Sequence, residues 1–338
     1  MTVHETDALV VGAGPVGLFA VFQCGMVKIR CHVVDALEAV GGQLSALYPE
    51  KPIYDIPGHP SILAADLVDR LAEQAAPFAP VHHFGVQVES LAREADGRWR
   101  CGLSNGETIL APVVIIAAGA GAFGPNRPPL DGLERYEGTS VFYLVRRRED
   151  FRDKRVVIAG GGDSAVDWAI SLSEVAAKVM VVHRRAKFRA APESEERLKQ
   201  LAASGAVELV VPYQLHALEG EDGRLSAVVV ADLDGQTKRL EADILLPFYG
   251  LSSNLGPIAE WGLTMDRHVI AVDPATGATS APGVFAAGDI CAYPGKLKLI
   301  LSGFAEAARV AHSAHDIVHP GEALHFEHST TSGVPGVK

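Results

Sequence analysis

The chain has 338 residues, of which 48% are apolar and 21% are charged. This length predicts two domains at about 100–200 residues each, and the composition excludes a largely disordered chain. Thirty Lys and Arg residues against 41 Asp and Glu residues give a net charge of −11, so the chain as a whole is a poor nucleic-acid binder. We therefore expect a folded protein with no nucleic-acid partner.

Cysteine usage and hydropathy indicate the cellular compartment. Four cysteines occur, and no two of them form a C-x-x-C pair, which is typical of a reducing cytoplasm. The N-terminus lacks the basic segment and the long apolar run of a signal peptide, and no apolar run of about 18 residues occurs anywhere. The sequence predicts a cytoplasmic protein without a membrane partner; the cysteines are Cys24, Cys31, Cys101 and Cys291.

The first expected element is a strand at residues 8–11 that runs into a glycine turn and then a helix. The turn contains Gly12, Gly14 and Gly17 in the pattern G-x-G-x-x-G. In such a turn the first glycine allows a tight bend, the second lets a pyrophosphate approach, and the third lets helix and strand pack closely. The helix N-terminus then offers free N–H groups to the phosphate. The next strand ends at Asp35, a position suited to accept ribose hydroxyls of FAD or NAD, although a single turn of this kind can also be a plain strand–helix connection.

The same pattern recurs in the middle of the chain. The segment VVIAGGGDSA contains Gly160, Gly162 and Ala165, and the following strand ends at His183. The separation from first glycine to strand end is 23 residues in both units (35 − 12 = 183 − 160 = 23). Two matches in one register indicate two dinucleotide sites.

The second strand end differs from the first in charge. It reads HRRAKFR, with Arg184, Arg185 and Arg189 following His183. Arginine binds phosphate through paired, charge-assisted hydrogen bonds, whereas a carboxylate would repel a 2′-phosphate. A solvated strand end is the alternative explanation for this cluster. We predict an NADP site in the second unit, and hence a chain that holds one flavin and one nicotinamide.

The order of strands predicts an insertion. We expect a Rossmann-like FAD domain of residues 1–118 plus 250–338, with a Rossmann-like NADP(H) domain of residues 119–249 inserted into it. Each domain is expected to be an α/β domain with three layers: a parallel sheet, helices on one face and a β-meander on the other. The meanders are expected at residues 86–111 and 207–241. The two connections between the domains form a double hinge that permits rotation.

These features together resemble a known family. The doubled glycine turn, the inserted domain and the segment GVFAAGDI are similar to the thioredoxin reductase superfamily, but the segment before the second turn has no cysteine, so dithiol chemistry is excluded there. Along nearly the full length the chain instead resembles the thioredoxin-reductase-like ferredoxin–NADP⁺ reductases. The stretches that carry the resemblance are GAGPVGLF, GGQLSALYPEKPIYDIPG, GGGDSAVDWA, HRRAKFRA, AAGDICAYPGKLKLILSGFAEAA and HSTTS.

The resemblance implies particular cofactor contacts. For FAD they are Gly12, Gly14, Pro15, Gly17, Asp35, Gln43, Tyr48, Val88, Phe123, Asp289, Thr330 and Thr331. For NADP they are Gly160, Gly161, Gly162, Asp163, Ser164, His183, Arg184, Arg185 and Arg189. Many relatives have Glu in place of Asp35.

Two ring contacts with the flavin follow from the same resemblance. Tyr48 is expected to stack on one face of the isoalloxazine, with Tyr54, or a purely structural aromatic, as the alternative. His328, from the C-terminal tail of the partner subunit, is expected to cover the other face, with the Ser329 hydroxyl nearby. The crossing tail implies a homodimer.

The implied activity is that of a ferredoxin (or flavodoxin)–NADP⁺ oxidoreductase. Hydride passes between nicotinamide C4 of NADPH and flavin N5, and electrons are exchanged singly with ferredoxin. A flavin-dependent NAD(P)H reductase or oxidase that uses quinone, oxygen or another acceptor is the alternative. No metal centre or protein nucleophile is expected, and His82-His83 is interpreted as a solvated turn. Candidate cations for docking an acidic ferredoxin are Arg146, Arg147, Arg148, Arg152 and Arg155, or Lys296 and Lys298.

Overall fold

The computed structural model describes residues 2–324 and 333–334. The chain divides into two compact units, which we call unit 1 (Met1–Ala122 and Ser253–Lys338) and unit 2 (Phe123–Ser252). These divisions lie a few residues C-terminal of the boundaries at 118/119 and 249/250 suggested by the sequence.

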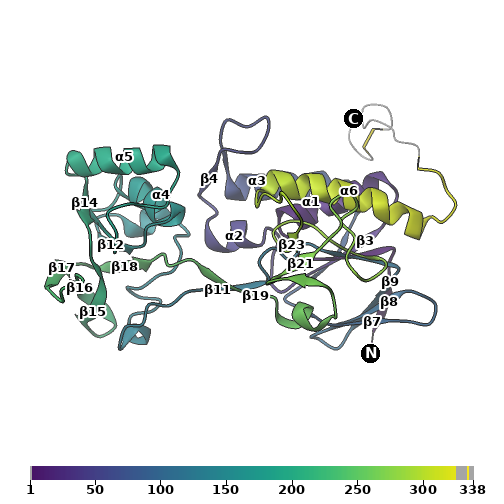
Figure 1. Ribbon diagram of the computed structural model, residues 1–338, viewed down its shortest axis with the longest axis horizontal. Coiled ribbons are helices and arrows are strands. Elements are labelled where there is room, and N and C mark those ends of the chain that lie inside the picture. The colour runs from purple at the N-terminus through teal and green to yellow at the C-terminus, as the bar shows by residue number, and fades with distance from the viewer. Residues whose placement is uncertain (1, 325–332, 335–338) are drawn as a thin grey trace. The chain divides into compact units, whose positions relative to one another are not determined.

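The chain passes between the units twice. The two passages are β11 (Ala122–Pro125) and β19 (Leu251–Asn254), which pair as a two-stranded sheet (Figure 1). The structure therefore contains the double connection that the sequence predicts.

Unit 1 is built on a parallel five-stranded sheet. Four of its strands are mainly apolar and buried, as expected for a parallel sheet that is covered on both faces, whereas the edge strand Val81–Phe84 contains two histidines and is exposed or half-buried. In spatial order they are β22 (Val284–Ala286), β10 (Val113–Ile116), β2 (Ala8–Val11), β3 (Cys31–Asp35) and β6 (Val81–Phe84).

Helices cover one face of this sheet. Alternate strand residues such as Val10, Val33 and Ile115 pack in one core with α1 and α6. Figure 1 shows the helices side by side above the sheet. They are α1 (Pro15–Met26), α3 (Ala64–Ala75) and α6 (Ile300–Val318).

A second sheet covers the other face. Leu9, Val34 and Val114, the intervening strand residues, pack against Trp99 and Ile109 of this sheet. The result is the three-layer arrangement predicted for this domain. In spatial order the strands are β1 (Val3–Glu5), β9 (Thr108–Ala111), β8 (Trp99–Leu103) and β7 (Val88–Arg93).

Short elements complete unit 1. They are α2 (Gln43–Leu47), the hairpin of β4 (Pro52–Ile53) and β5 (Ile62–Leu63), the sheet of β20 (Met265–Asp266), β21 (Val269–Ala271) and β23 (Cys291–Ala292), and the 3₁₀ turns Ala76–Phe78 and Gly256–Glu260.

Unit 2 repeats the plan with fewer strands. Its parallel sheet contains β14 (Val207–Val210), β13 (Lys178–Val182), β12 (Arg155–Ala159) and β18 (Ile244–Pro247). Its helices are α4 (Asp163–Leu172) and α5 (Pro192–Ala203). An antiparallel sheet packs on the other face, made of β15 (Gln214–Glu221), β16 (Arg224–Ala231) and β17 (Thr237–Glu241). The 3₁₀ turns are Leu133–Arg135 and Arg148–Phe151.

Two local expectations were wrong. The meander of unit 2 does not begin at residue 207, because Val207–Val210 pairs in parallel with β13 and extends the main sheet. His82 and His83 do not form a solvated turn, because both lie on β6, opposite Val33 and Val34 of β3.

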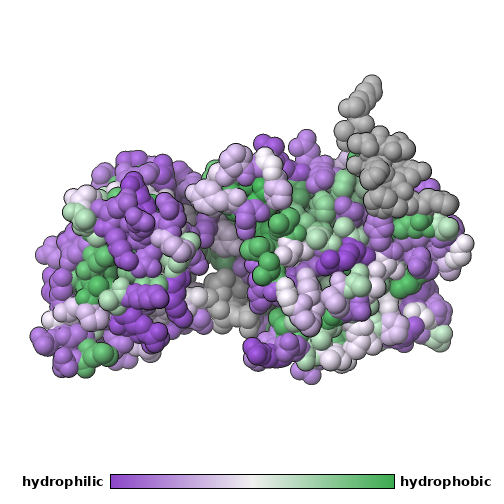
Figure 2. All heavy atoms as spheres, turned by 45° about the horizontal axis from the view of Figure 1, so that its top comes forward, coloured by the Kyte–Doolittle hydropathy of each residue, from purple (hydrophilic) through white to green (hydrophobic). Residues whose placement is uncertain are grey.

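Hydrophilic residues dominate the visible face of unit 2, and apolar residues there form small separate groups (Figure 2). Within the described residues, no helix has both the length and the apolar character needed to cross a lipid bilayer.

Candidate functional site

Of the three glycines in the first turn, Gly12 and Gly17 leave no space for a side chain, whereas Gly14 does. A Cβ at Gly12, whose φ is +108°, would lie 2.5 Å from the Ala117 carbonyl oxygen, and one at Gly17 would lie 1.9 Å from the Gly12 carbonyl oxygen. These contacts confirm the tight bend and the close helix packing that glycine permits. A Cβ at Gly14 would meet no atom of the described part of the chain within 4 Å. The open space lies at the position where a pyrophosphate would approach the backbone.

The N-terminus of α1 faces this space without a competing group. Gly14 is the N-cap residue, and Pro15 occupies the first turn. No acidic residue lies in that turn, and no side chain among residues 2–324 and 333–334 caps the helix. Free N–H groups and the positive end of the helix dipole favour a bound phosphate. The turn and helix therefore fit the diphosphate of a dinucleotide.

Asp35, at the end of β3, stabilises this turn by accepting backbone hydrogen bonds. Its Oδ2 accepts a hydrogen bond from the Ala13 N–H at 2.6 Å, and its Oδ1 accepts one from Leu37 at 2.8 Å. Burial raises the pKa of Asp35, and this effect exceeds the lowering by the two hydrogen bonds. The carboxylate thus lies at the rim of the open space, and its role toward ribose hydroxyls stays a prediction.

Tyr48 and Asp289 come together from distant parts of the chain. Tyr48 directly follows α2, the helix that begins at Gln43. Burial raises the pKa of Tyr48, and the negative charge of Asp289 adds to the shift. Asp289 itself is exposed after β22, while Tyr54, the alternative stacking residue, is 71% exposed. Tyr48 is therefore the more buried ring of the two, and its stacking on the flavin stays a prediction.

The remaining FAD candidates lie on β7, on β11 and in the C-terminal tail. Val88 is 3% exposed on β7, where it is paired with Leu103. Phe123 lies in β11, and the description there covers the backbone only. Four tail residues lie outside the described residues, so their roles stay predictions: His328, Ser329, Thr330 and Thr331.

A buried acid that the sequence analysis missed holds the loop before Asp289. Glu306 of α6 is 3% exposed. Its Oε2 accepts the Gly288 N–H at 2.7 Å, and its Oε1 accepts the Tyr293 hydroxyl at 2.6 Å and Lys296 Nζ at 2.5 Å. An acid within the apolar face of a helix was the signal that could have identified it.

This network corrects one docking candidate. The Lys296 side chain is 7% exposed because it lies against Glu306. A buried, ion-paired ammonium cannot attract a partner protein from solution. Lys296 therefore belongs to the interior of unit 1.

The second glycine turn has the same open position. A Cβ at Gly162 would meet nothing within 4 Å, whereas one at Gly161 would lie 2.3 Å from the His183 ring. Helix α4 begins at Asp163 after the uncapped Gly162, and Asp163 turns its Oδ1 to the Ala191 N–H at 2.9 Å. The helix N-terminus and the exposed Ser164 thus remain available to a phosphate.

The basic segment folds back onto this turn. The Arg189 N–H donates to the Gly161 carbonyl oxygen at 2.6 Å, and Arg184, Arg185 and Arg189 are exposed. Burial lowers the pKa of His183, and the charges of the three arginines add to that lowering. The structure therefore gathers the predicted 2′-phosphate cations around the second turn.

The four cysteines offer no exposed dithiol. All are free and buried. Burial raises the pKa of Cys101 and of Cys291 to about 12, and contact with Cys24 together with burial raises the pKa of Cys31 well above its usual value. Thiolate exchange needs an accessible, ionised sulfur, so none of these is suited to it.

Two nucleotide-type domains of this kind define a class. The pattern of the family described as pyridine nucleotide-disulphide oxidoreductase matches residues 6–315. A solved structure, the thioredoxin reductase of T. acidophilum, superimposes with a TM-score of 0.79 at 26% identity and covers 93% of this chain and 98% of that chain. The chain has the fold of these flavoproteins.

Relatives among curated sequences restrict the class of protein further. A ferredoxin–NADP reductase of Paramagnetospirillum magneticum is 84% identical over 335 residues, which is 99% of this chain and 99% of the relative. Another, of Rhodospirillum rubrum, is 66% identical over 336 residues, 98% of this chain and 97% of the relative. The chain belongs to the thioredoxin-reductase-like ferredoxin–NADP reductase family.

Proposed function

We propose that the chain transfers electrons between NADPH and ferredoxin, or flavodoxin, through a bound FAD. The observation that carries this proposal is the pair of open glycine turns at uncapped helix N-termini, one braced by Asp35 and the other surrounded by exposed arginines. The membership of the family and the names of its members support the same activity. When bound, FAD accepts a hydride from NADPH and releases electrons one at a time.

The residues divide into two binding sets. We assign the diphosphate of FAD to Gly12, Gly14, Pro15 and Gly17, and its ribose to Asp35. The free N–H groups at the start of α1 supply the electrostatic attraction. We assign the flavin ring to Tyr48, which stacks on one face, with Gln43 and Asp289 at its polar edge and Val88 at the adenine end.

The NADP set follows the same logic in unit 2. The turn Gly160, Gly161 and Gly162 with Asp163 and Ser164 receives the diphosphate. Arg184, Arg185 and Arg189 receive the 2′-phosphate, because guanidinium groups pair with phosphate oxygens in a fixed geometry. His183, which lies against Gly161, keeps the turn in position.

Ferredoxin docking requires a local basic surface on an acidic chain. Of the predicted cations, Arg148 pairs with Glu174, Arg152 with Glu149, and Arg155 with Asp243. Arg146 and Arg147 are exposed. We therefore assign the docking surface to Arg146 and Arg147.

The tail and the assembly are part of the proposal. We propose a cytoplasmic homodimer in which residues 325–338 of one subunit reach the flavin of the other, with His328 on the open ring face and Ser329, Thr330 and Thr331 beside it. Deletion of residues 325–338 should then change the rate of hydride transfer measured by stopped-flow absorbance. An unchanged rate would remove the stacking role of His328.

One experiment tests the function as a whole. The purified chain is titrated with NADPH without oxygen while the yellow flavin absorbance is followed, and ferredoxin-linked reduction of cytochrome c is then measured. We expect bleaching at one NADPH per FAD and turnover that depends on ferredoxin. Bleaching with turnover only on quinone or oxygen would favour a flavin-dependent reductase or oxidase, and failure to bleach would refute the proposal.

A further inference from the structure

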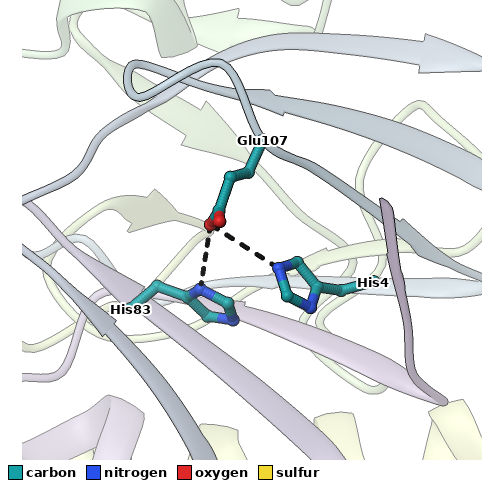
Figure 3. A group of neighbouring side chains, drawn as sticks. All are labelled: His4, His83 and Glu107. Atoms are coloured by element: carbon teal, nitrogen blue, oxygen red, sulfur yellow. Dashed lines mark ion pairs between the residues drawn. The ribbon is translucent and has the colours of Figure 1, made fainter. Parts of the chain in front are cut away.

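Three side chains of types that can bind metals converge in unit 1. His4 lies on β1, His83 on β6, and Glu107 immediately precedes β9. Their nearest ligand atoms all lie within 4.8 Å of one another. Figure 3 shows both imidazole rings pointing toward the same carboxylate from separate strands.

The distances are close to those of a metal-binding set. His4 Nε2 lies 3.5 Å from Glu107 Oε2, and His83 Nδ1 lies 3.8 Å from the same oxygen. Zinc–ligand bonds of about 2.0–2.1 Å in a tetrahedron place two ligand atoms about 3.3 Å apart. Side-chain movements of a few tenths of an ångström bring both nitrogens to that separation from the oxygen.

One of these nitrogens, His4 Nε2, makes no hydrogen bond to any described residue. His4 Nε2 is shielded from solvent, and among the residues 2–324 and 333–334 it has no hydrogen-bond partner. A buried polar atom without a partner is destabilising and therefore needs an explanation. Coordination of a cation satisfies this nitrogen and the carboxylate together.

A third histidine, His32, orients His83. His32 Nδ1 lies 3.0 Å from His83 Nε2. When His83 Nε2–H donates to His32, the lone pair of His83 Nδ1 points at Glu107, which is the tautomer that a metal requires. Burial lowers the pKa of His83, and it lowers that of His32 to about 4.

The carboxylate is held in place but remains accessible. The Asn105 side-chain amide donates to Glu107 Oε2 at 3.1 Å. The exposed fractions are 32% for Glu107, 29% for His4 and 9% for His83, which leaves an entry path and room for water as a further ligand.

We propose that His4, His83 and Glu107 bind a divalent transition-metal cation, with Zn²⁺ as the natural occupant and His32 as a positioning residue. Two imidazoles and one carboxylate favour zinc over magnesium or calcium, which prefer oxygen ligands. Because the ligands come from β1, β6 and the turn before β9, the cation would join the edges of the two stacked sheets. The role is structural and independent of the electron-transfer proposal.

Metal competition tests this site on the full-length, FAD-loaded chain without an affinity tag. After treatment with EDTA, Zn²⁺ is titrated in the presence of a chromophoric chelator, and we expect one tightly bound Zn²⁺ per chain. His4→Gln, His83→Gln and Glu107→Gln should each weaken Zn²⁺ binding at least tenfold, and His32→Phe by about 10–100-fold, as for residues that orient a ligand. His82→Ala is the matched control, since the adjacent β6 side chain points to the opposite face and its loss should leave affinity unchanged.

A second measurement needs no variant and so does not depend on the folding of any mutant. Metal coordination of an imidazole slows exchange of its C2 hydrogen with deuterium, and this exchange is measured for each histidine by mass spectrometry with and without Zn²⁺. We expect Zn²⁺ to slow exchange at His4 and His83 but not at His82. Equal exchange under both conditions, or Zn²⁺ binding that the three ligand variants leave unchanged, would overturn the proposal and indicate an adventitious ion only.

Discussion

Replacement of Glu306 by glutamine tests the buried network beside Asp289. The substitution keeps the shape of the side chain but removes the charge opposite Lys296, whose side chain is only 7% exposed. Leaving one member of a buried ion pair without its partner destabilises a protein by about 3–5 kcal/mol. Each kcal/mol lowers the melting temperature of a unit of this size by about 2–4 °C, so Glu306→Gln should melt about 6–20 °C lower than the native chain.

The reciprocal change should be milder. Lys296→Met removes the cation, but Glu306 still accepts hydrogen bonds from the Gly288 N–H and the Tyr293 hydroxyl. The lost contact is one hydrogen bond to a charged group, which contributes about 1.5–3 kcal/mol. In the double variant no unpaired ammonium remains, so its destabilisation should be smaller than the sum of the two single effects by about 1–3 kcal/mol.

The assay is thermal unfolding followed by circular dichroism, at a fixed excess of FAD, for the native chain and the three variants. Release of flavin fluorescence in the same samples reports the Gly288–Asp289 loop, and Glu306→Gln should release FAD at a lower temperature than Lys296→Met does. Equal effects of the two single changes that add in the double variant would refute the argument, because that is the behaviour of an exposed pair.

Three further outcomes are expected from the described geometry. The double variant Arg184→Ala, Arg185→Ala should raise the KM for NADPH at least tenfold and leave the KM for NADH nearly unchanged. Arg224→Ala is the control, because Arg224 is also exposed. An equal rise in KM for both nucleotides would show that the two arginines do not recognise the 2′-phosphate. Arg146→Glu with Arg147→Glu should raise the KM for ferredoxin, most strongly at low salt, while NADPH-dependent dye reduction is unchanged; unaltered ferredoxin kinetics would discard this surface. Ellman's reagent at pH 8 should leave the four buried thiols of the native chain unreacted and titrate all four after denaturation. A rapidly reacting native thiol would contradict their burial and the raised pKa values of Cys31, Cys101 and Cys291.

Local sequence patterns were sufficient to predict the two strand–turn–helix–strand units that contain the glycine turns. The separation from Gly12 to Asp35 and from Gly160 to His183 fixes a strand, a helix and a second strand, because each step is set by backbone geometry. The parallel pairing of β2 with β3, and of β12 with β13, agrees with this expectation.

Contacts between distant segments were beyond the reach of these patterns. The segment Val207–Val210 is too short for its periodicity to distinguish a meander strand from an edge strand of the main sheet. His83 faces Glu107 only because β6 and the turn before β9 meet through tertiary packing. Glu306 and Lys296 are ten residues apart (306 − 296 = 10). No local sequence pattern predicts that a lysine in a loop forms an ion pair with a glutamate in the following helix.

The adjacency of β11 and β19 has an engineering consequence. Residues 123–252 form one continuous stretch whose entry and exit strands are neighbours in a single small sheet. Stretches with closely spaced ends are the ones that tolerate excision and transplantation between hosts. Under the proposed assignment of NADPH to unit 2, this stretch can be exchanged as a block. A chimera that carries an NADH-selective domain there would change its electron donor while unit 1, the proposed FAD site, stays the same.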